Sequence, residues 1–211
     1  HDEDCLTLNV FTPEDMDPAN PYPVMVWFYG GAFTGGTTIQ YPGHFLATRD
    51  VIIVASNYRV GIFGFASTDD DAARGNWGLH DQRLALEWVL ENIEAFGGDP
   101  NSVTLFGQSA GGASSSHHIV SPGSRGLFHK VIAQSGTDMN FWSFNYPDSQ
   151  PENYTKAVAA NVDCPTEDNF EMMECLRGVE QWHLRNNSGF PCSPGHFCQG
   201  HAPVVDGVFF P

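Results

Sequence analysis

The sequence predicts an α/β protein built on a mostly parallel central sheet. Residues 24–29 and 51–56 are continuous apolar runs, which are typical of strands that are covered on both faces. Apolar residues spaced by three and four from Leu79 to Phe96 predict a long buried helix, and residues 103–106 then form a third short apolar run. Strands that alternate with helices are joined by crossovers, which indicate a parallel sheet.

The first part of the chain predicts a further strand. Residues 6–11 alternate between apolar and polar side chains, as a half-buried strand does. Residues 12–21 are polar and contain prolines, so we expect a hairpin-like loop there. The run at 24–29 ends in Gly30-Gly31-Ala32-Phe33. This glycine-rich end is either a flexible turn or a segment whose backbone N–H groups face a ligand.

The second half of the chain continues the alternation and then changes character. A helix is expected from Ala110 to about Val120, where Ser121-Pro122-Gly123 ends it. Residues 131–136 read as another short buried strand. After about Thr137 aromatic residues become frequent and charges cluster. The remaining expectations are three helices at 152–162, 167–176 and 179–184, a loop at 186–201, and a strand with a turn at 203–210.

The stretch Gly107-Gln108-Ser109-Ala110-Gly111 fits the pattern G-x-S-x-G, which between a strand and a helix is typical of a nucleophile elbow. The turn is so tight that a Cβ on either flanking position would clash, so glycine is required there. Backbone strain lifts the serine Oγ clear of the chain, and the helix start presents N–H groups to developing negative charge. The alternative is a glycine-rich turn with an incidental serine, which the flanking strand and helix patterns disfavour.

Composition limits the classes of partner. The chain has 211 residues, 41% of them hydrophobic, so it can bury one substantial core. Nine Lys and Arg against 25 Asp and Glu give a net charge of −16, which argues against nucleic acid and against an anionic membrane surface. No apolar run reaches membrane-spanning length. Asp69-Asp70-Asp71 is most simply a solvated loop, and neither a metal nor a cofactor is expected.

The cysteines and two glycosylation sequons favour an oxidising, secretory context. Cys192 and Cys198 flank a Pro-Gly turn, and their proximity alone suggests a pair. The sequons begin at Asn153 and Asn186. The chain has no initiating Met and opens and stops within motifs, so we expect it to be part of a longer protein, secreted or on the extracellular face of a membrane.

Several blocks together resemble the type-B carboxylesterase/cholinesterase family of the α/β-hydrolase fold. They occur in the family's order over nearly the whole chain. The resemblance implies helices on both faces of the sheet and a single catalytic domain, of which residues 1–211 would be one part, truncated at both ends. The matching stretches are 3–6, 24–33, 57–59, 75–83, 96–100, the elbow, 121–124, 134–136 and 203–207.

The resemblance implies specific roles at the elbow and at the glycine-rich loop. Ser109 would be the nucleophile, and the backbone N–H groups of Gly31, Ala32 and Ala110 would form the oxyanion hole. Where the family usually has a third glycine, this chain has Ala32, which adds a methyl group at the mouth of the hole. Where the family commonly has Glu before the serine, this chain has Gln108, as in juvenile-hormone esterases and some other arthropod esterases.

Further implied features lie outside the elbow. The family's catalytic Glu or Asp and His would lie beyond Pro211, so we expect residues 1–211 alone to be inactive. Trp142 matches a tryptophan that lines the acyl pocket in cholinesterases, or it is a core aromatic. Phe197 is available for the same pocket, but Gln199 stands where a second aromatic is expected.

The family also bears on the remaining cysteines. Cys164 and Cys175 have the spacing of a family disulfide, and Cys5 resembles one half of another whose partner lies upstream.

The sequence also predicts a buried ion pair. Arg59 ends a buried strand and cannot lose its proton, so we predict that it pairs with a buried carboxylate, Asp81.

Two classes of function remain open. The first is a serine esterase that hydrolyses a small-molecule ester through an acyl-enzyme on Ser109. Among the enzymes, Gln108 and Gln199 favour a general carboxylesterase over a cholinesterase. The second is a cholinesterase-like adhesion protein, as in neuroligins, that has lost catalysis. The intact Ser109 and its flanking glycines favour the enzyme.

Overall fold

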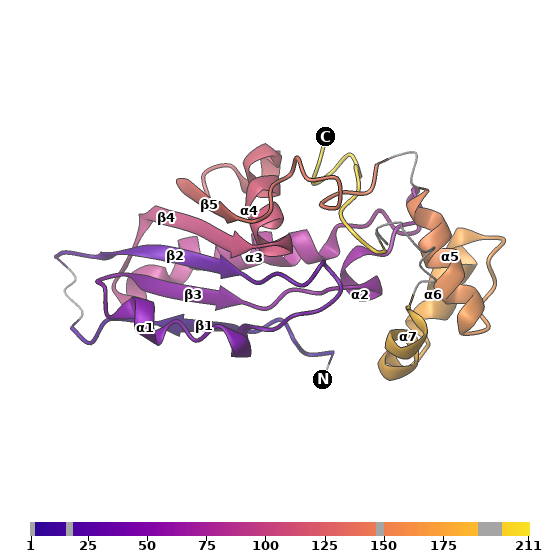
Figure 1. The fold of residues 1–211 in the computed structure, drawn as a ribbon, viewed down its shortest axis with the longest axis horizontal. Helices are drawn as coiled ribbons and strands as arrows, with labels where there is room; N and C mark the ends of the chain where they lie inside the picture. The colour runs from indigo at the N-terminus through magenta and orange to yellow at the C-terminus, as the bar shows by residue number, and fades with distance from the viewer. Residues whose placement is uncertain (1–2, 16–18, 147–149, 190–199) are drawn as a thin grey trace.

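The computed structural model describes residues 3–15, 19–146, 150–189 and 200–211. Within these ranges the chain forms a five-stranded sheet of order β1-β3-β2-β4-β5 (Figure 1). The strand β1 is antiparallel to β3, and the other pairings are parallel. The strands are Leu8–Phe11 (β1), Tyr22–Phe28 (β2), Ile52–Ser56 (β3), Gly98–Gln108 (β4) and Lys130–Gln134 (β5).

Helices cover both faces of the sheet. One face packs against α3 (Trp77–Asn92) and α4 (Ala110–Val120), since Leu86 of α3 belongs to the same cluster as Phe28 of β2 and His118 of α4 stacks on Phe28. In Figure 1, α3 passes behind the strands. The opposite face carries α1 (His44–Ala47), since a Cβ on Gly43, just before this helix, would lie 2.7 Å from Ile53 of β3. Cover from both sides explains why β3 is buried along its whole length and why the last three residues of β2 are buried, and the predicted α/β-hydrolase architecture is confirmed.

Three 3-10 turns and the short helix α2 complete the body. The turns are Thr38–Gln40 (η1), Ile93–Phe96 (η2) and Pro122–Ser124 (η3), and α2 spans Ile62–Phe65. The turn η2 continues α3 to Gly97, whose left-handed φ of 78° ends the helix. The helix α3 therefore returns the chain directly to β4.

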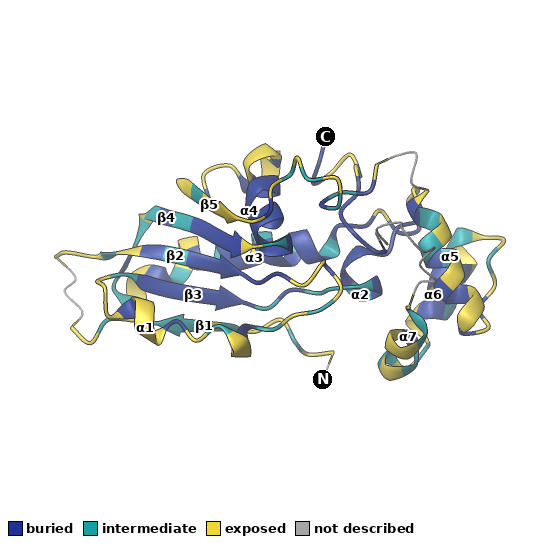
Figure 2. Cartoon of the chain, viewed as in Figure 1, coloured by how far each residue is buried: buried dark blue, intermediate teal, exposed yellow. Residues whose placement is uncertain are grey.

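A small helical group lies beyond the carboxyl ends of the parallel strands. It contains α5 (Pro151–Asn161), α6 (Asn169–Arg177) and α7 (Gln181–Asn187), drawn in orange in Figure 1. Its buried residues, coloured dark blue in Figure 2, form one apolar cluster with α2 and the loop that follows it. A disulfide joins Cys164 to Cys175, as the family resemblance implies. Thr155 connects the group to the body, because its Oγ donates to Ser67 O at 2.7 Å.

The structure corrects four expectations. The strand expected at 131–136 is not buried: β5 is the last strand in the order of the described sheet, and four of its five residues are exposed. Residues 12–21 do not close a hairpin, because β3 inserts between β1 and β2. The strand β4 begins at Gly98 rather than at residue 103, since Gly98 pairs with Tyr22 across a bulge. Residues 203–210 form no strand: Val204 makes a single bridge to Asn145. The turn that follows is held by Asp206 Oδ1, which accepts backbone N–H bonds from residues 208, 209 and 210.

The predicted partnership of Arg59 and Asp81 is confirmed. Arg59 Nε and Nη2 donate to the two oxygens of Asp81, both at 2.8 Å, and the Arg59 backbone N–H donates at 3.0 Å. Hydrogen bonding to Asp81 raises the pKa of Arg59 above its ordinary value. The Asp81 side chain is 5% exposed and the Arg59 side chain 38%, so the pair ties the end of β3 to the buried side of α3.

Replacing Asp81 with asparagine should therefore destabilise the full-length protein. We expect a loss of about 2–3 kcal/mol, between the ~1 kcal/mol of an exposed pair and the ~3–5 kcal/mol of a buried one. Urea unfolding measures the change. Asp71→Asn is the matched control, because Asp71 pairs with Arg74 at the surface, where the side chains are 74% and 53% exposed. Equal midpoints for the two variants would contradict a structural role for Asp81.

Candidate active site

Ser109 occupies a strained turn between β4 and α4. Its backbone lies at φ 56° and ψ −123°, a combination that a residue with a side chain rarely adopts. The strain is held in place from both sides, because Ser109 N–H donates to Gln134 O at 2.8 Å and Ser109 O accepts from Ala113 N–H at 2.9 Å. The serine is half-buried. The predicted geometry of a nucleophile elbow is therefore present.

The glycines that flank Ser109 leave no room for a side chain. A Cβ on Gly107 would lie 2.4 Å from the backbone of Gly111. A Cβ on Gly111 would lie 1.9 Å from Phe28 O in the neighbouring strand β2. Both obstacles are backbone atoms, so neither can rotate away. The elbow thus packs on itself and on the carboxyl end of β2.

The glycine-rich loop after β2 lies against the serine. A Cβ on Gly30 would be 3.0 Å from Ser109 Cβ, so the two segments touch. The loop then turns sharply, with φ values of 132° at Gly31, 54° at Ala32 and 61° at Phe33. Gly31 O faces into this turn and accepts from the N–H groups of residues 34 and 35. Gly31 and Ala32 are exposed, and no described residue accepts a hydrogen bond from their N–H groups.

Ala110 contributes a third N–H group beside the loop. It is the first residue of α4 and is fully buried. The N–H groups in the first turn of a helix have no acceptor within the helix, and they carry partial positive charge. The three predicted donors therefore come from two segments that meet at Ser109. An arrangement of this kind can stabilise an oxyanion.

The aromatic neighbourhood of Ser109 includes Trp142. A Cβ on Gly136 would lie 2.1 Å from Ser109 O and 3.0 Å from Trp142 Cη2, so the indole and the serine backbone share this neighbour. Trp142 is half-buried and packs against the core cluster that contains Ala113. Phe197, Gln199, Cys192 and Cys198 lie outside the described residues.

Two adjacent histidines lie within α4, and both are packing residues. His117 is 1% exposed and is surrounded by the rings of Phe33, Phe144 and Phe210. Neither of its ring nitrogens has a hydrogen-bond partner among the described residues. Burial lowers the pKa of His117 to about 4, against a smaller opposing influence from Asp138. No hydrogen bond joins a described histidine to Ser109.

His118 belongs to a buried polar network that the sequence did not predict. Its Nδ1 lies 2.8 Å from Ser124 Oγ and its Nε2 lies 3.2 Å from Gln82 Oε1. Gln82 Nε2 donates to Ser114 Oγ at 3.1 Å, so the network connects α3, α4 and η3. Burial, followed by the nearby His117, lowers the pKa of His118 to about 3. The run of polar residues at 114–118, inside a helix that must cover a sheet, was the available signal.

The segment after residue 200 is tied to the start of α3. Asn76 Nδ2 donates to Val204 O at 2.7 Å, and Val204 N–H donates to Asn76 Oδ1 at 3.0 Å. Phe209, which is fully buried, then stacks edge-on against His118 and His80. These contacts place residues 204–209 beside α4, the helix that follows Ser109.

The sequon asparagines are accessible on the helical group. Asn153 in α5 and Asn186 in α7 are both exposed. Cys5, also a candidate for pairing, has a free thiol and is half-buried. Burial, the largest influence, raises the pKa of that thiol.

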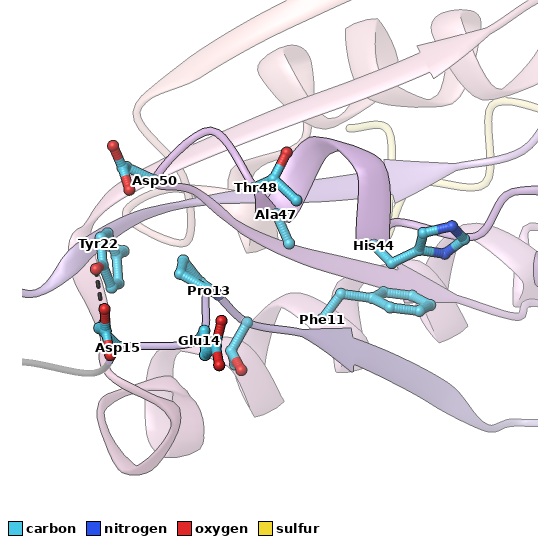
Figure 3. Close-up of a pocket in the computed structure, with 10 residues that line it drawn as sticks. Phe11, Pro13, Glu14, Asp15, Tyr22, His44, Ala47, Thr48 and Asp50 are labelled. Carbon is cyan, nitrogen blue, oxygen red and sulfur yellow. Dashed lines mark hydrogen bonds between the residues drawn. The ribbon is translucent and has the colours of Figure 1, made fainter.

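A groove of about 530 Å³ lies at the opposite end of the sheet, where β2 and β3 begin (Figure 3). Its lining includes Glu14, Asp15, Asp50 and His44, and Tyr22 Oη donates to Asp15 O at 2.7 Å. Ser109 follows the carboxyl end of the parallel strand β4, so this groove is remote from it. Among the described residues no group of His, Cys, Asp or Glu could hold a metal ion. In the described part of the chain, no helix is both long enough and apolar enough to cross a membrane.

Comparison with known proteins identifies the family to which this chain belongs. The model of the Carboxylesterase family matches residues 1–211. Carboxylesterase 5A of Felis catus is 43% identical, over 99% of this chain and 37% of its own. Human bile salt-activated lipase is 42% identical, over 100% and 29%. Neuroligin-2 of Mus musculus is 42% identical, over 99% and 27%. The chain thus spans about a third of the length of these relatives, and it belongs to the carboxylesterase family, with the α/β-hydrolase fold.

Proposed function

We propose that the full-length protein is a serine carboxylic-ester hydrolase in which Ser109 forms an acyl-enzyme. The observation that carries the proposal is the strained Ser109, flanked by glycines at which a Cβ would clash. A loop touches this serine, and its exposed residues Gly31 and Ala32 have N–H groups with no acceptor among the described residues. Attack of Ser109 Oγ on an ester carbonyl turns the carbonyl oxygen into an oxyanion. The N–H groups of Gly31, Ala32 and Ala110 stabilise it, and one such donor typically contributes ~10²–10³ in rate.

The proton of Ser109 needs a base, which the described residues do not offer. The described histidines make no hydrogen bond to Ser109, and His117 and His118 are held away from it by packing. The relatives are about three times as long as this chain, so the proposal takes the base, and the carboxylate that orients it, from chain beyond Pro211. Residues 1–211 then form part of a single catalytic domain that is completed on both sides.

The substrate is a small carboxylic ester, and a neutral one is favoured. Gln108 precedes the nucleophile and is exposed beside it, with no charge to attract a cationic substrate. Trp142 lies close enough to the serine backbone to line the acyl side of the site. A net charge of −16 disfavours nucleic acid as a partner. A juvenile-hormone ester is one member of this neutral class, and a choline ester is the alternative.

We also propose that the protein works in an oxidising environment, either secreted or on the extracellular face of a membrane. The Cys164–Cys175 disulfide supports it, as does the exposure of Asn153 and Asn186 at glycosylation sequons. Neuroligin-2 is as similar to this chain as the lipase is, so sequence identity does not separate an esterase from an adhesion protein. The intact serine and its two glycines favour the esterase.

A covalent probe tests the function directly. The full-length protein should react with an organophosphonate at Ser109, because a neutral serine becomes nucleophilic only beside a base and an oxyanion hole. Mass spectrometry of the peptide that contains Ser109 measures the adduct, and Ser109→Ala should abolish both the adduct and ester hydrolysis. Correctly folded protein without an adduct would support the adhesion alternative.

A further inference from the structure

Two buried tyrosines stack on each other and exchange hydrogen bonds at the carboxyl ends of β2 and β3. Tyr29 and Tyr58 are each 2% exposed, and their rings stack with centroids 4.4 Å apart and planes 16° from parallel. Tyr58 Oη donates to Tyr29 O at 2.6 Å. In return, Tyr29 Oη donates to Tyr58 O at 2.9 Å and accepts from Tyr58 N–H at 3.2 Å.

The carbonyl group that Tyr58 holds begins the glycine-rich loop. Tyr29 O belongs to the peptide unit that joins Tyr29 to Gly30, directly before Gly31 and Ala32. A Cβ on Gly111 would lie 2.8 Å from Tyr29 C, so the elbow packs against the same peptide unit. The unit is therefore fixed between the hydroxyl of Tyr58 and the first turn of α4. Its orientation sets the direction in which the chain leaves β2.

The returning side of the loop rests on the same pair. A Cβ on Gly36 would lie 2.3 Å from Tyr29 Cδ2 and 2.8 Å from Gly30 O, so this part of the chain lies flat on the Tyr29 ring. Gly36 has a φ of 138°, a value that favours glycine. The loop that carries Gly31 and Ala32 thus has its departure and its return anchored on one tyrosine stack.

We propose that Tyr58 is a positioning residue for ester hydrolysis: its hydroxyl fixes the Tyr29–Gly30 peptide and thereby aims the N–H groups of Gly31 and Ala32 at the oxyanion. This inference rests on the proposed function of Ser109. Burial raises the pKa of Tyr58 well above its ordinary value and that of Tyr29 to about 12, so both hydroxyls remain donors at neutral pH. Preorganised donors act on the transition state rather than on the bound substrate.

Tyr58→Phe tests the role, because it keeps the ring and its stacking and removes only the hydroxyl. We expect kcat of the full-length enzyme to fall about 10–100-fold, less than the ~10²–10³ lost with a whole donor. KM for a nitrophenyl ester should change less than threefold. Affinity for a trifluoromethyl ketone, whose adduct with Ser109 carries the oxyanion, should fall in parallel with kcat. Rates are normalised to active sites titrated with an organophosphonate, so loss of folded protein does not contribute.

Two matched variants separate positioning from stability. Tyr29→Phe removes a hydroxyl from the same stack, but its bonds go to the backbone of Tyr58, so a comparable loss of stability should accompany a smaller loss of kcat. Tyr22→Phe removes a hydroxyl-to-carbonyl bond at the remote end of the sheet and should leave kcat unchanged.

The outcomes distinguish this inference from the function on which it rests. A wild-type protein that takes no label at Ser109 would overturn both. A labelled wild type, with Tyr58→Phe retaining wild-type kcat and ketone affinity, would overturn the positioning role alone. Equal losses of kcat in Tyr58→Phe and Tyr29→Phe would show that the Tyr58 hydroxyl has no positioning role of its own.

Discussion

Gly111→Ala should destabilise the full-length protein by about 3 kcal/mol or more, at the upper end of what overpacking usually causes. Alanine is intrinsically better than glycine in a helix by ~1 kcal/mol, which would favour the variant. The overlap outweighs this gain, because the new methyl group would lie 1.9 Å from Phe28 O and 2.6 Å from Phe28 C. Both are backbone atoms of the central strand, so either β2 or the whole start of α4 must move.

Urea unfolding and the yield of soluble full-length protein measure this effect. Gly189→Ala is the control, since a Cβ there has no atom of a described residue within 4 Å, and its midpoint should stay within ~0.5 kcal/mol of wild type. A normal midpoint for Gly111→Ala would show that α4 does not pack on β2 as described. Because Ser109 lies two residues before Gly111, any variant that does fold should also lose phosphonate labelling.

Acid should destabilise the protein through its buried histidines. The pKa values of His117, His118 and His201 are lowered by burial to about 4, 3 and 3. Unfolding returns each to about 6.5, so the unfolded state binds more protons below that pH. The stability that these three histidines contribute is fully present above about pH 6.5. It is lost as the pH falls toward their pKa values in the folded state. Each histidine contributes about 1.4 kcal/mol per pH unit in this window.

A pair of variants assigns this acid sensitivity to individual residues. Between pH 6.5 and 4.5, His117→Phe should reduce the slope of the unfolding free energy against pH by the contribution of one proton, about 1.4 kcal/mol per pH unit. At pH 7.5 this variant should be as stable as wild type. The residue lies among aromatic rings, with Asp138 as the only charged neighbour that influences it, and its nitrogens have no described partner. An apolar ring can therefore replace it without breaking a hydrogen bond.

His118→Phe should reduce the same slope but also destabilise at pH 7.5. It leaves Gln82 and Ser124 without their partner, and an unsatisfied buried group costs about 1–3 kcal/mol. Arg83 and His80, the other charged or titratable groups that influence His118, are unchanged in this variant. Urea midpoints at several pH values measure both effects. Parallel pH curves for wild type and the two variants would contradict the neutral, buried state of these histidines.

The sequence predicts the sheet and the elbow because their signals are local. A continuous apolar run requires cover on both faces, and Ser109 requires glycine on either side, whatever the rest of the chain does. The pairing of Arg59 with Asp81 was also predictable, because a guanidinium at the end of a buried strand needs a carboxylate nearby.

Other features depend on long-range placement, which a local pattern does not encode. Nothing in residues 6–28 indicates that β3 will insert between β1 and β2, since strand order is set by packing across the whole sheet. The reciprocal bonds of Tyr29 and Tyr58 join residues 29 positions apart, and both side chains read as ordinary core aromatics. The strand expected at 203–210 failed because Asp206 bonds the following N–H groups locally and replaces a ladder.

The bonds between Asn76 and Val204 impose an order on folding. They join residues 128 positions apart, and the intervening chain contains β4, the elbow and the helical group. At a synthesis rate of ~5–20 residues per second, Val204 emerges roughly 6–25 seconds after Asn76. During that interval the start of α3 lacks its backbone partner, and Asn76 must hold its left-handed conformation without support. A nascent chain paused before residue 200 should therefore be recognised by chaperones that bind unfinished sheet proteins, and one paused well after residue 211 should escape them.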